Sequence, residues 1–195
     1  MITTILCLCI GYLVGSLSSA IVVCRLLQLP DPREKGSGNP GTTNVLRLGG
    51  KKAALFTLLG DVVKGTVPVL VAMIAGLPAF WVATVGLVAM CGHLWPVFFQ
   101  FKGGKGFATF LGVLLGLSWP LTLLAIALWL LVAAITRYSS LAALITTALA
   151  PIVFLIGGHI MYILPILAMS ILLWYRHINN IQRLRDGTES KIQWR

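Results

Sequence analysis

Acidic residues are scarce in this sequence. Its 195 residues include 5 Asp and Glu against 15 Lys and Arg, so charged residues make up 10% of the chain and the formal net charge is +10. About a quarter of the residues of a soluble domain are charged, whereas 58% of this chain is hydrophobic and its mean hydropathy is +0.94. The composition therefore excludes an ordinary soluble domain and predicts an integral membrane protein.

Cysteine pairs, metal-ligand clusters and internal repeats are also lacking. The four cysteines lie in apolar stretches without a C-x-x-C spacing, which indicates small buried side chains rather than disulfides or a metal site. The basic residues do not form the patch or block that nucleic-acid binding needs. We therefore expect no metal, no cofactor and no nucleic-acid partner, and one membrane-embedded domain over residues 1–195.

Long apolar runs alternate with short polar connections. A bilayer core of ~30 Å needs about 20 apolar helical residues. Apolar segments lie at 3–28, 53–77, 80–99, 107–118, 120–136, 141–157 and 159–175. They predict an all-α polytopic membrane protein with about seven transmembrane helices. The fourth, FATFLGVLLGLS, would extend only ~18 Å at 1.5 Å per residue, so we expect it to be short or half-spanning.

The basic residues alternate between the two sides of this predicted bundle. Except for Lys64, they lie in or at the edge of the first, third and fifth connections and in the tail at 176–195, and none lies in the second, fourth or sixth connection. Cytoplasmic loops of membrane proteins are enriched in Lys and Arg. The pattern predicts an N-terminus outside and a C-terminus in the cytoplasm, together with every polar loop.

The first connection contains GSGNPGTTNVLR, in which Gly36, Gly38 and Gly41 have the spacing of a dinucleotide-binding turn. That turn must follow a strand in a βαβ unit, and here an apolar helix precedes it, which excludes a nucleotide site. Glycines still allow successive N–H groups to line an anion-binding nest. Polar side chains surround them: Ser37, Asn39, Thr42, Thr43, Asn44 and Arg47. The stretch predicts a phosphate-binding loop; a polar turn capped by its own side chains is the alternative.

The third connection contains GHLWPVFFQFKGGKG, where Lys102 and Lys105 flank Gly103 and Gly104 just before the short fourth segment. A helix N-terminus has unpaired N–H groups and a partial positive charge, so anions bind there. We predict a second phosphate site, with ordinary interfacial lysines as the alternative. His93, at the start of the same stretch, suits a structural role as well as a catalytic one.

Other polar residues lie within or beside apolar segments. Asp61 and Lys64 are three apart on one helix face and predict a mutual ion pair that positions the phosphate loops, with direct substrate contact by Lys64 as the alternative. His177 and Asn180, one helical turn apart, either reach the same site or mark an ordinary cationic helix end. Ser140 either joins them or caps its helix.

Five stretches, taken in order, resemble the bacterial PlsY family of acyl-phosphate:glycerol-3-phosphate acyltransferases. They are GSGNPGTTNVLR, DVVKG, GHLWPVFFQFKGGKG, TRYSSL and RHINNIQRL-x-x-GTESK. The resemblance covers essentially the whole chain. It implies a seven-helical fold and transfer of a fatty acyl group from acyl phosphate to the 1-hydroxyl of sn-glycerol 3-phosphate. The products would be lysophosphatidic acid and inorganic phosphate, formed at the cytoplasmic face of the bacterial inner membrane as the first step of phospholipid synthesis.

The predicted site combines the glycine-rich turns with the residues that match the family's motifs. We assign catalytic roles to Ser37, Lys105, His177 and Asn180. We assign substrate-binding roles to Gly36, Gly38, Asn39, Gly41, Thr43, Asn44, Arg47, His93, Lys102, Gly103, Gly104 and Ser140. The family often has a charged pair with an acidic member between its His and Asn, but this chain has Ile178 and Asn179 there, so no acidic residue receives a role at that point.

The sequence leaves the acceptor of the hydroxyl proton open. His177, His93 and a substrate phosphate are candidates, and we favour the phosphate because no His–carboxylate pair is evident. The H-x-x-x-x-D motif of thioester-using acyltransferases is absent, which favours an acyl phosphate donor.

The expected partners are glycerol 3-phosphate, acyl phosphate and membrane lipid. The sequence leaves open a transient contact with an enzyme that forms acyl phosphate. A membrane transporter of organic phosphates is the alternative function, although paired repeats and midplane binding residues, which transporters often show, are not evident in the sequence.

Overall fold

The structure, a computed structural model, describes residues 1–192, and every regular element in that range is helical. Arg195, one of the predicted tail cations, lies outside the described residues. The chain divides into two compact units, the first at Met1–Leu117 and the second beginning at Ser118. The prediction of a single domain stays a prediction.

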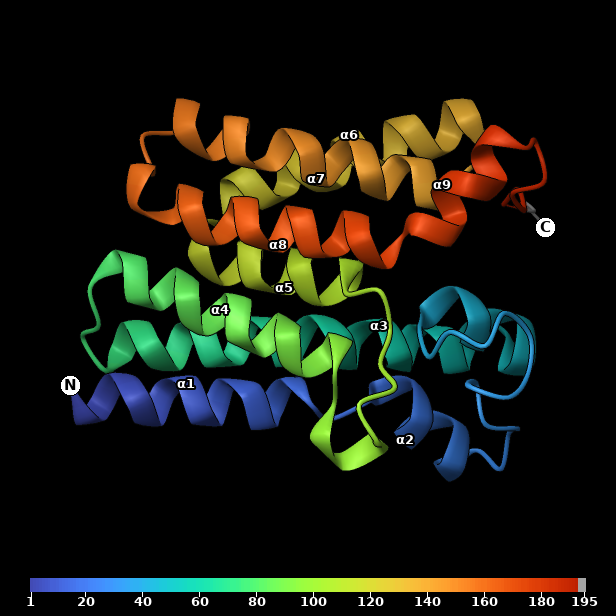
Figure 1. Cartoon of the computed structure of the whole chain (residues 1–195), viewed down its shortest axis with the longest axis horizontal. Coiled ribbons are helices and arrows are strands. Elements are labelled where there is room, and N and C mark those ends of the chain that lie inside the picture. The colour runs from blue at the N-terminus through green and yellow to red at the C-terminus, as the bar shows by residue number, and fades with distance from the viewer. Residues whose placement is uncertain (193–195) are drawn as a thin grey trace. The chain divides into compact units, whose positions relative to one another are not determined.

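Six helices form the first unit (Figure 1). They are α1 (Ile2–Gly15), α2 (Ser19–Leu26), α3 (Thr42–Ile74), α4 (Ala79–Leu94), the 3-10 helix η1 (Val97–Phe99) and α5 (Phe107–Leu117). The first predicted segment is a pair, α1 and α2, bent by 42°. The helix predicted to start at 53 already begins at Thr42, and Gly50 at φ 73° marks a kink inside it. Hydropathy missed this start because residues 42–52 are mostly polar.

Glycines allow the helices of the first unit to pack closely. A side chain on Gly15 of α1 would collide with the backbone of Ala89 in α4, and one on Gly65 of α3 would collide with the carbonyl oxygen of Thr109 in α5. Small residues at such contacts are typical of helices packed within membranes, where van der Waals contact rather than the hydrophobic effect drives association. Fully buried side chains, Phe110 among them, fill the space between these helices.

Within residues 118–192, the second unit contains five helical elements. They are α6 (Trp119–Thr136), α7 (Ser139–Ile156), the 3-10 helix η2 (Ile160–Tyr162), α8 (Ile163–Arg176) and α9 (Ile178–Arg185). The Ser170 hydroxyl of α8 donates a hydrogen bond to the carbonyl oxygen of Thr147 in α7, at 2.7 Å. Such a bond satisfies a hydroxyl where no water is present. The exposed residues of α6 are mostly large and apolar, including Leu130 and Leu131, as expected of a surface in contact with lipid.

Four helices within residues 1–192 are long and apolar enough to cross a membrane, and the number rises to six if each of the two bent pairs is one span. The second bent pair, η2 with α8 and then α9, turns by 58°. Helix α5 is shorter, as predicted for the fourth segment. The all-helical prediction is confirmed, whereas the count of seven spans and the orientation of the termini stay predictions.

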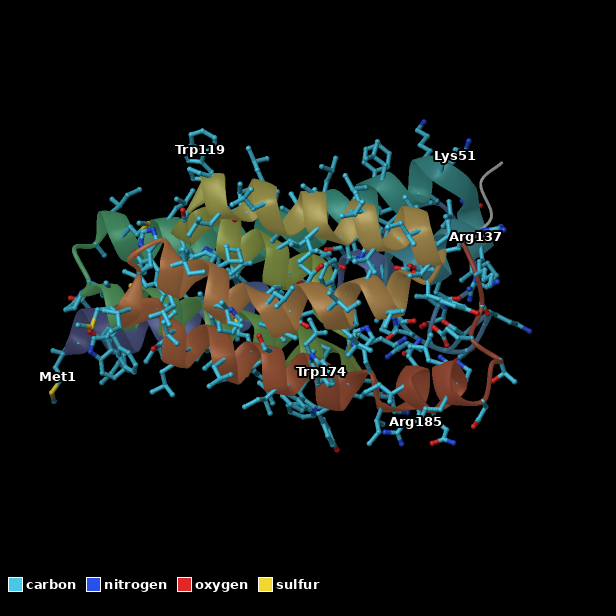
Figure 2. The ribbon with its side chains drawn as sticks, turned by 90° about the horizontal axis from the view of Figure 1, so that it is seen from above. Met1, Lys51, Trp119, Arg137, Trp174 and Arg185 are labelled. Atoms are coloured by element: carbon cyan, nitrogen blue, oxygen red, sulfur yellow. The ribbon has the colours of Figure 1, made fainter. Side chains whose placement is uncertain are left out.

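Each unit has an apolar end and a polar end. In the first unit Met1 and Lys51 lie at opposite ends, and in the second unit Trp119 and Arg137 do (Figure 2). The predicted phosphate loops of the first unit and the tail of the second unit belong to the polar ends. In each unit, the predicted site residues therefore lie at the ends of helices rather than in their middles.

Candidate active site

Asn44 organises the glycine-rich loop of the first unit from inside. Its side chain is buried; Oδ1 accepts a hydrogen bond from the backbone N–H of Ser37 at 2.9 Å, and Nδ2 donates to the carbonyl oxygens of Pro32 and Lys35 at 2.8 and 2.9 Å. Gly36 lies against Oδ1 at φ 68°, where a side chain would collide with that oxygen. The self-capped turn is thus present, and Asn44 contributes by holding the loop.

The remaining predicted residues of this loop face outward. Ser37, Gly38, Thr43 and Arg47 are exposed and Asn39 is partly buried. Gly41 is the N-terminal capping residue of α3, and it has no side chain that could bond to the first N–H groups of the helix. The first N–H groups of a helix have no partner within the helix, so the start of α3 presents donors beside exposed hydroxyls and a guanidinium group.

Thr42 adds a hydroxyl at this helix start. Its Oγ1 is buried and has no hydrogen-bond partner within the described part of the chain. A buried hydroxyl without a partner is costly, which supports Thr42, one of the polar side chains of the predicted phosphate loop, as a candidate ligand. The sequence alone had not assigned it a specific binding or catalytic role.

The second glycine turn is packed onto the end of α4. Gly103 and Gly104 are buried, and the N–H of Gly104 donates to the carbonyl oxygen of His93 at 3.3 Å. A side chain on Gly103 would collide with that same oxygen. The connection between α4 and α5 folds back past the end of α4 before α5 begins (Figure 1). Lys102 is exposed and Lys105 partly buried just before the N-terminus of α5, in the position predicted for a phosphate ligand.

The two glycine turns meet. A side chain on Gly104 would collide with Nε2 of His93 and lie 2.9 Å from the carbonyl oxygen of Pro40. The first loop, the end of α4 and the second turn therefore converge in the first unit, although more than fifty residues of sequence separate the two turns. Two helix starts, α3 and α5, follow these turns, and together they can hold two anionic groups.

A buried ion pair lies beneath this convergence. Lys64 Nζ is 2.8 Å from Asp61 Oδ1, which confirms the predicted pair. The same carboxylate oxygen is 3.6 Å from Nδ1 of His93. The expectation that the chain has no His–carboxylate pair is therefore wrong. Asp61 belongs to α3 and His93 to α4, so only helix packing brings them together and no sequence spacing indicates it.

The second unit gathers its predicted polar residues around one carboxylate. Glu189 Oε1 accepts hydrogen bonds from the Ser140 hydroxyl at 2.7 Å and from Nδ2 of Asn180 at 2.6 Å, and Oε2 accepts one from Nε of Arg183 at 2.7 Å. Burial by itself raises the pKa of Glu189, but the hydrogen bonds and the charge of Arg183 outweigh it and hold the pKa below its ordinary value. The sequence prediction gave Glu189 no role, although it lies in the GTESK stretch.

His177 is buried at the bend between α8 and α9. Its Nδ1 lies 2.8 Å from the carbonyl oxygen of Leu173. Because a carbonyl oxygen only accepts, Nδ1 carries the proton in this bond. In the neutral ring, Nε2 is then the nitrogen that can act as a base. Asn180 follows one turn later and is held by Glu189, so the two predicted residues lie on adjoining helices of the same unit.

The end of the described chain is tied to the start of α7. Ile192 N–H donates to the carbonyl oxygen of Arg137 at 2.7 Å, and Arg137 Nη2 donates to the carbonyl oxygen of Ile192 at 3.1 Å. Lys191 Nζ lies 5.6 Å from the centre of the Tyr138 ring, a cation–π contact. These contacts and Glu189 bring the TRYSSL stretch to the GTESK stretch.

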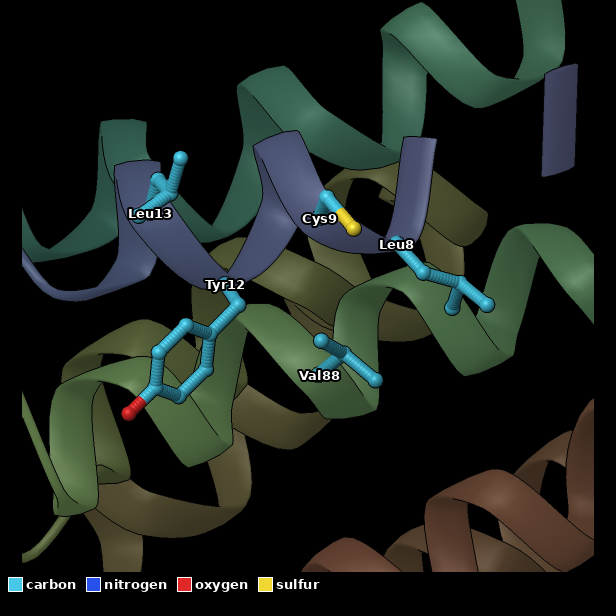
Figure 3. A pocket seen from close by; sticks show the side chains of 5 residues that line it. All are labelled: Leu8, Cys9, Tyr12, Leu13 and Val88. Carbon is cyan, nitrogen blue, oxygen red and sulfur yellow. The ribbon is translucent and has the colours of Figure 1, made fainter. Parts of the chain in front are cut away.

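An apolar hollow of about 450 Å³ lies between α1 and α4 and contains no predicted site residue (Figure 3). Its walls are Leu8, Cys9, Tyr12, Leu13 and Val88. The Tyr12 hydroxyl donates to the carbonyl oxygen of Trp95 at 2.8 Å, so its polar tip is already satisfied. The hollow suits hydrocarbon and offers nothing that would bind a phosphate.

Residues 5–187 match the family model described as glycerol-3-phosphate acyltransferase. The chain belongs to the glycerol-3-phosphate acyltransferase family. It is 52% identical over 189 residues to a glycerol-3-phosphate acyltransferase of Coxiella burnetii (strain CbuG_Q212). This alignment covers 97% of this chain and 98% of that protein. It is 56% identical over 185 residues to the enzyme of the same name from Methylococcus capsulatus, with 93% and 92% covered.

Two crystal structures are also similar to this member of the glycerol-3-phosphate acyltransferase family. Both are of PlsY, an integral membrane glycerol 3-phosphate acyltransferase, in a glycerol 3-phosphate form and a lysophosphatidic acid form. The first has a TM-score of 0.93 at 35% identity, and the second a TM-score of 0.90 at 34% identity. Each match covers 98% of this chain and 96% of the other. These likenesses confirm the predicted resemblance to the PlsY family and the integral membrane fold.

Proposed function

We propose that the protein transfers a fatty acyl group from acyl phosphate to the 1-hydroxyl of sn-glycerol 3-phosphate, giving 1-acyl-glycerol 3-phosphate and inorganic phosphate. Membership of the family supports the acyltransferase activity, and the two PlsY structures, named for glycerol 3-phosphate and for lysophosphatidic acid, support the acceptor and the product. The observation that carries the proposal is the meeting of the two glycine turns at two helix starts. It offers places for the phosphates of two substrates.

The reaction needs positioning more than covalent activation. The hydroxyl oxygen forms a bond to the acyl carbonyl carbon, and the bond between that carbon and the phosphate oxygen breaks. Phosphate leaves with the bonding pair. Because an acyl phosphate is already a mixed anhydride with a good leaving group, orientation and charge stabilisation supply most of the rate.

Cations and backbone N–H groups of the first unit would bind the phosphates. Lys105 and Arg47 are assigned to them because a guanidinium fork and an ammonium group match phosphate oxygens. Ser37, Thr43 and Lys102 are exposed beside them, where they can contribute further donors. Asn39 and the glycines shape the loops, and Asn44 supports the first loop from inside.

The hydroxyl proton is assigned to a phosphate of the substrates. The His93–Asp61 pair does not change this assignment, because the ring of His93 lies behind Gly104 with Nδ1 toward Asp61. His177 remains the alternative base; on the resemblance alone, Asn180 is assigned to catalysis and Ser140 to substrate binding. Substitution of His177 decides between the two bases.

The enzyme would work at the cytoplasmic face of the bacterial inner membrane. The alternation of basic loops supports this sidedness, and the exposed apolar helix surfaces would let the acyl chain remain in lipid. A transient contact with an enzyme that forms acyl phosphate would deliver the donor.

Phosphate release tests the proposal. Purified protein in detergent, given acyl phosphate and glycerol 3-phosphate, is expected to release inorganic phosphate and form lysophosphatidic acid. Replacing acyl phosphate with acyl-CoA is expected to abolish turnover. If no phosphate is released while proteoliposomes take up glycerol 3-phosphate, the protein is a transporter and the proposal is wrong.

A further inference from the structure

The ion pair beneath the glycine turns is buried more completely than stability requires. Asp61, Lys64 and His93 are 2%, 4% and 6% exposed. Removing two charges from water costs free energy that their attraction only partly returns, so apolar residues of similar volume often stabilise a protein as well or better. Stability alone therefore does not account for the pair, and its contacts indicate what else it does.

Lys64 joins α3 to the break between α1 and α2. Its Nζ donates a hydrogen bond to the carbonyl oxygen of Leu17 at 2.8 Å. Leu17 lies between the end of α1 and the start of α2, where a broken helix leaves carbonyl groups without helical partners. Lys64 therefore fixes the bend of the first helix pair, and Asp61 neutralises the buried ammonium group at 2.8 Å.

Asp61 also faces the imidazole that supports the second turn. Its Oδ1 lies 3.6 Å from Nδ1 of His93, and the opposite edge of that ring, at Nε2, lies against Gly104. The N–H of Gly104 in turn donates to the carbonyl oxygen of His93. A ring rotated away from Asp61 would press on Gly104, because no space remains for even a methyl group there.

We propose that Asp61 is a positioning residue for the 102–105 turn, which it acts on through His93, while Lys64 compensates its charge and fixes the helix bend. The proposal rests on the phosphate-binding role given to this turn above. The continuous set of contacts runs from Leu17 through Lys64, Asp61 and His93 to Gly104, all within the first unit. The carboxylate contacts no substrate in this arrangement; it sets the backbone that does.

Charge-removing variants separate positioning from simple ion-pair stability. Asp61→Asn and Lys64→Met each leave one buried charge without its partner, so each is expected to lower the Tm by roughly 10 °C. The double variant Asp61→Asn/Lys64→Met removes both charges and is expected to recover most of that loss. Exposed Asp186→Asn and Lys51→Met are the matched controls and should leave both Tm and turnover unchanged.

The Michaelis constants give the decisive readout. In the double variant, KM for the substrate whose phosphate the 102–105 turn binds is expected to rise roughly tenfold or more, as misplacement of a binding group does, while the other KM and kcat change less. Recovery of Tm together with wild-type values of both KM would show that the pair is structural only, and would overturn the proposal.

Substitution of His93 tests whether Asp61 acts on the 102–105 turn through this side chain. His93→Gln alone is expected to raise the same KM while the Asp61–Lys64 pair stays intact, so this variant also serves if the double variant does not fold. Adding His93→Gln to the double variant should raise that KM no further. A further rise of that KM in the triple variant, or an unchanged KM in His93→Gln alone, would overturn the proposal.

A binding measurement keeps this test distinct from the proposed reaction. Calorimetric titration with glycerol 3-phosphate and with inorganic phosphate compares the same variants without turnover. If the wild-type protein binds phosphate but releases none from acyl phosphate, the proposed reaction fails, and the expected weakening in the double variant still decides the role of Asp61.

Discussion

The two units use polar side chains in opposite ways. In the first unit, backbone N–H groups at two glycine turns lie beside exposed basic side chains, and no ion pair holds Arg47 or Lys102 within residues 1–192. In the second unit, the donors of Ser140, Asn180 and Arg183 all converge on Glu189. One region is arranged to receive an anion, and the other already contains one.

This contrast predicts where each unit is sensitive. A site formed by backbone depends on the absence of side chains at its glycines and on the cations beside it. A cluster formed by side chains depends on the carboxylate at its centre. Substitutions at the glycine turns and at the cations beside them should therefore reduce catalysis with little loss of stability, whereas loss of Glu189 should reduce stability first.

The largest effect is expected at the phosphate-binding cations. Lys105→Ala and Arg47→Ala should each lower kcat/KM by roughly 10²–10³-fold, the range found when one donor to a developing charge is removed. Turnover is measured by phosphate release, and folding by size exclusion and thermal unfolding, with Lys51→Ala as the exposed basic control. Near-normal turnover in both variants would show that the substrate phosphates do not bind at these two cations.

Gly104→Ala should have the next largest effect. The added methyl group would collide with the His93 ring and lie 2.9 Å from the Pro40 carbonyl oxygen, so the two turns must separate and KM should rise. Gly158→Ala is the matched control. It has open space and costs only the strain of φ 81°, about 1–2 kcal/mol. Equal kinetic effects of the two substitutions would contradict the meeting of the turns as the basis of binding.

Glu189→Gln should lower the stability of the second unit. The substitution removes the charge that accepts hydrogen bonds from three donors. Each hydrogen bond to a charged group contributes about 1.5–3 kcal/mol to stability. Because Arg183 is exposed, the expected loss lies toward the low end of that range. Thermal unfolding measures it, with Asp186→Asn as the control carboxylate. A Tm equal to that of the control would mean that Glu189 does not hold the cluster.

The same residue predicts an acid dependence. Because the pKa of Glu189 is lowered in the folded protein, its contribution to stability is complete above its unfolded pKa and is lost as the pH falls through the folded value. The Tm of the wild-type protein should therefore fall more steeply on acidification than that of Glu189→Gln. Parallel curves would contradict the assignment.

The smallest of the kinetic effects is expected for His177→Ala. If a substrate phosphate takes the proton, turnover should fall by less than the loss in Lys105→Ala and its pH profile should keep its shape. A general base contributes roughly 10²–10⁴-fold. A loss of that size, together with loss of the titration on the acidic limb of the pH profile, would make His177 the base.

Sequence reasoning succeeded where a contact lies within one helical turn or one loop. The Asp61–Lys64 pair followed from a spacing of three residues, and the short helix α5 followed from its length. It failed at contacts between helices. Asp61 with His93, and Pro40 with Gly104, depend on how α3 and α4 pack and on how the α4–α5 connection folds back. Glu189 was missed because it reaches Ser140 and Asn180 only after the tail turns back on itself.

Composition and local spacing by themselves determined that this chain is helical, embedded in a membrane and equipped with glycine-rich turns beside basic residues. These properties depend on hydropathy and on the spacing of neighbouring residues, both of which are given directly by the sequence. Only the tertiary structure decided which polar groups meet: the two turns over His93, the buried carboxylate behind them, and the tail carboxylate among Ser140, Asn180 and Arg183. Close contacts at glycines bring the helices together, and contacts between distant segments depend on that packing rather than on spacing along the chain.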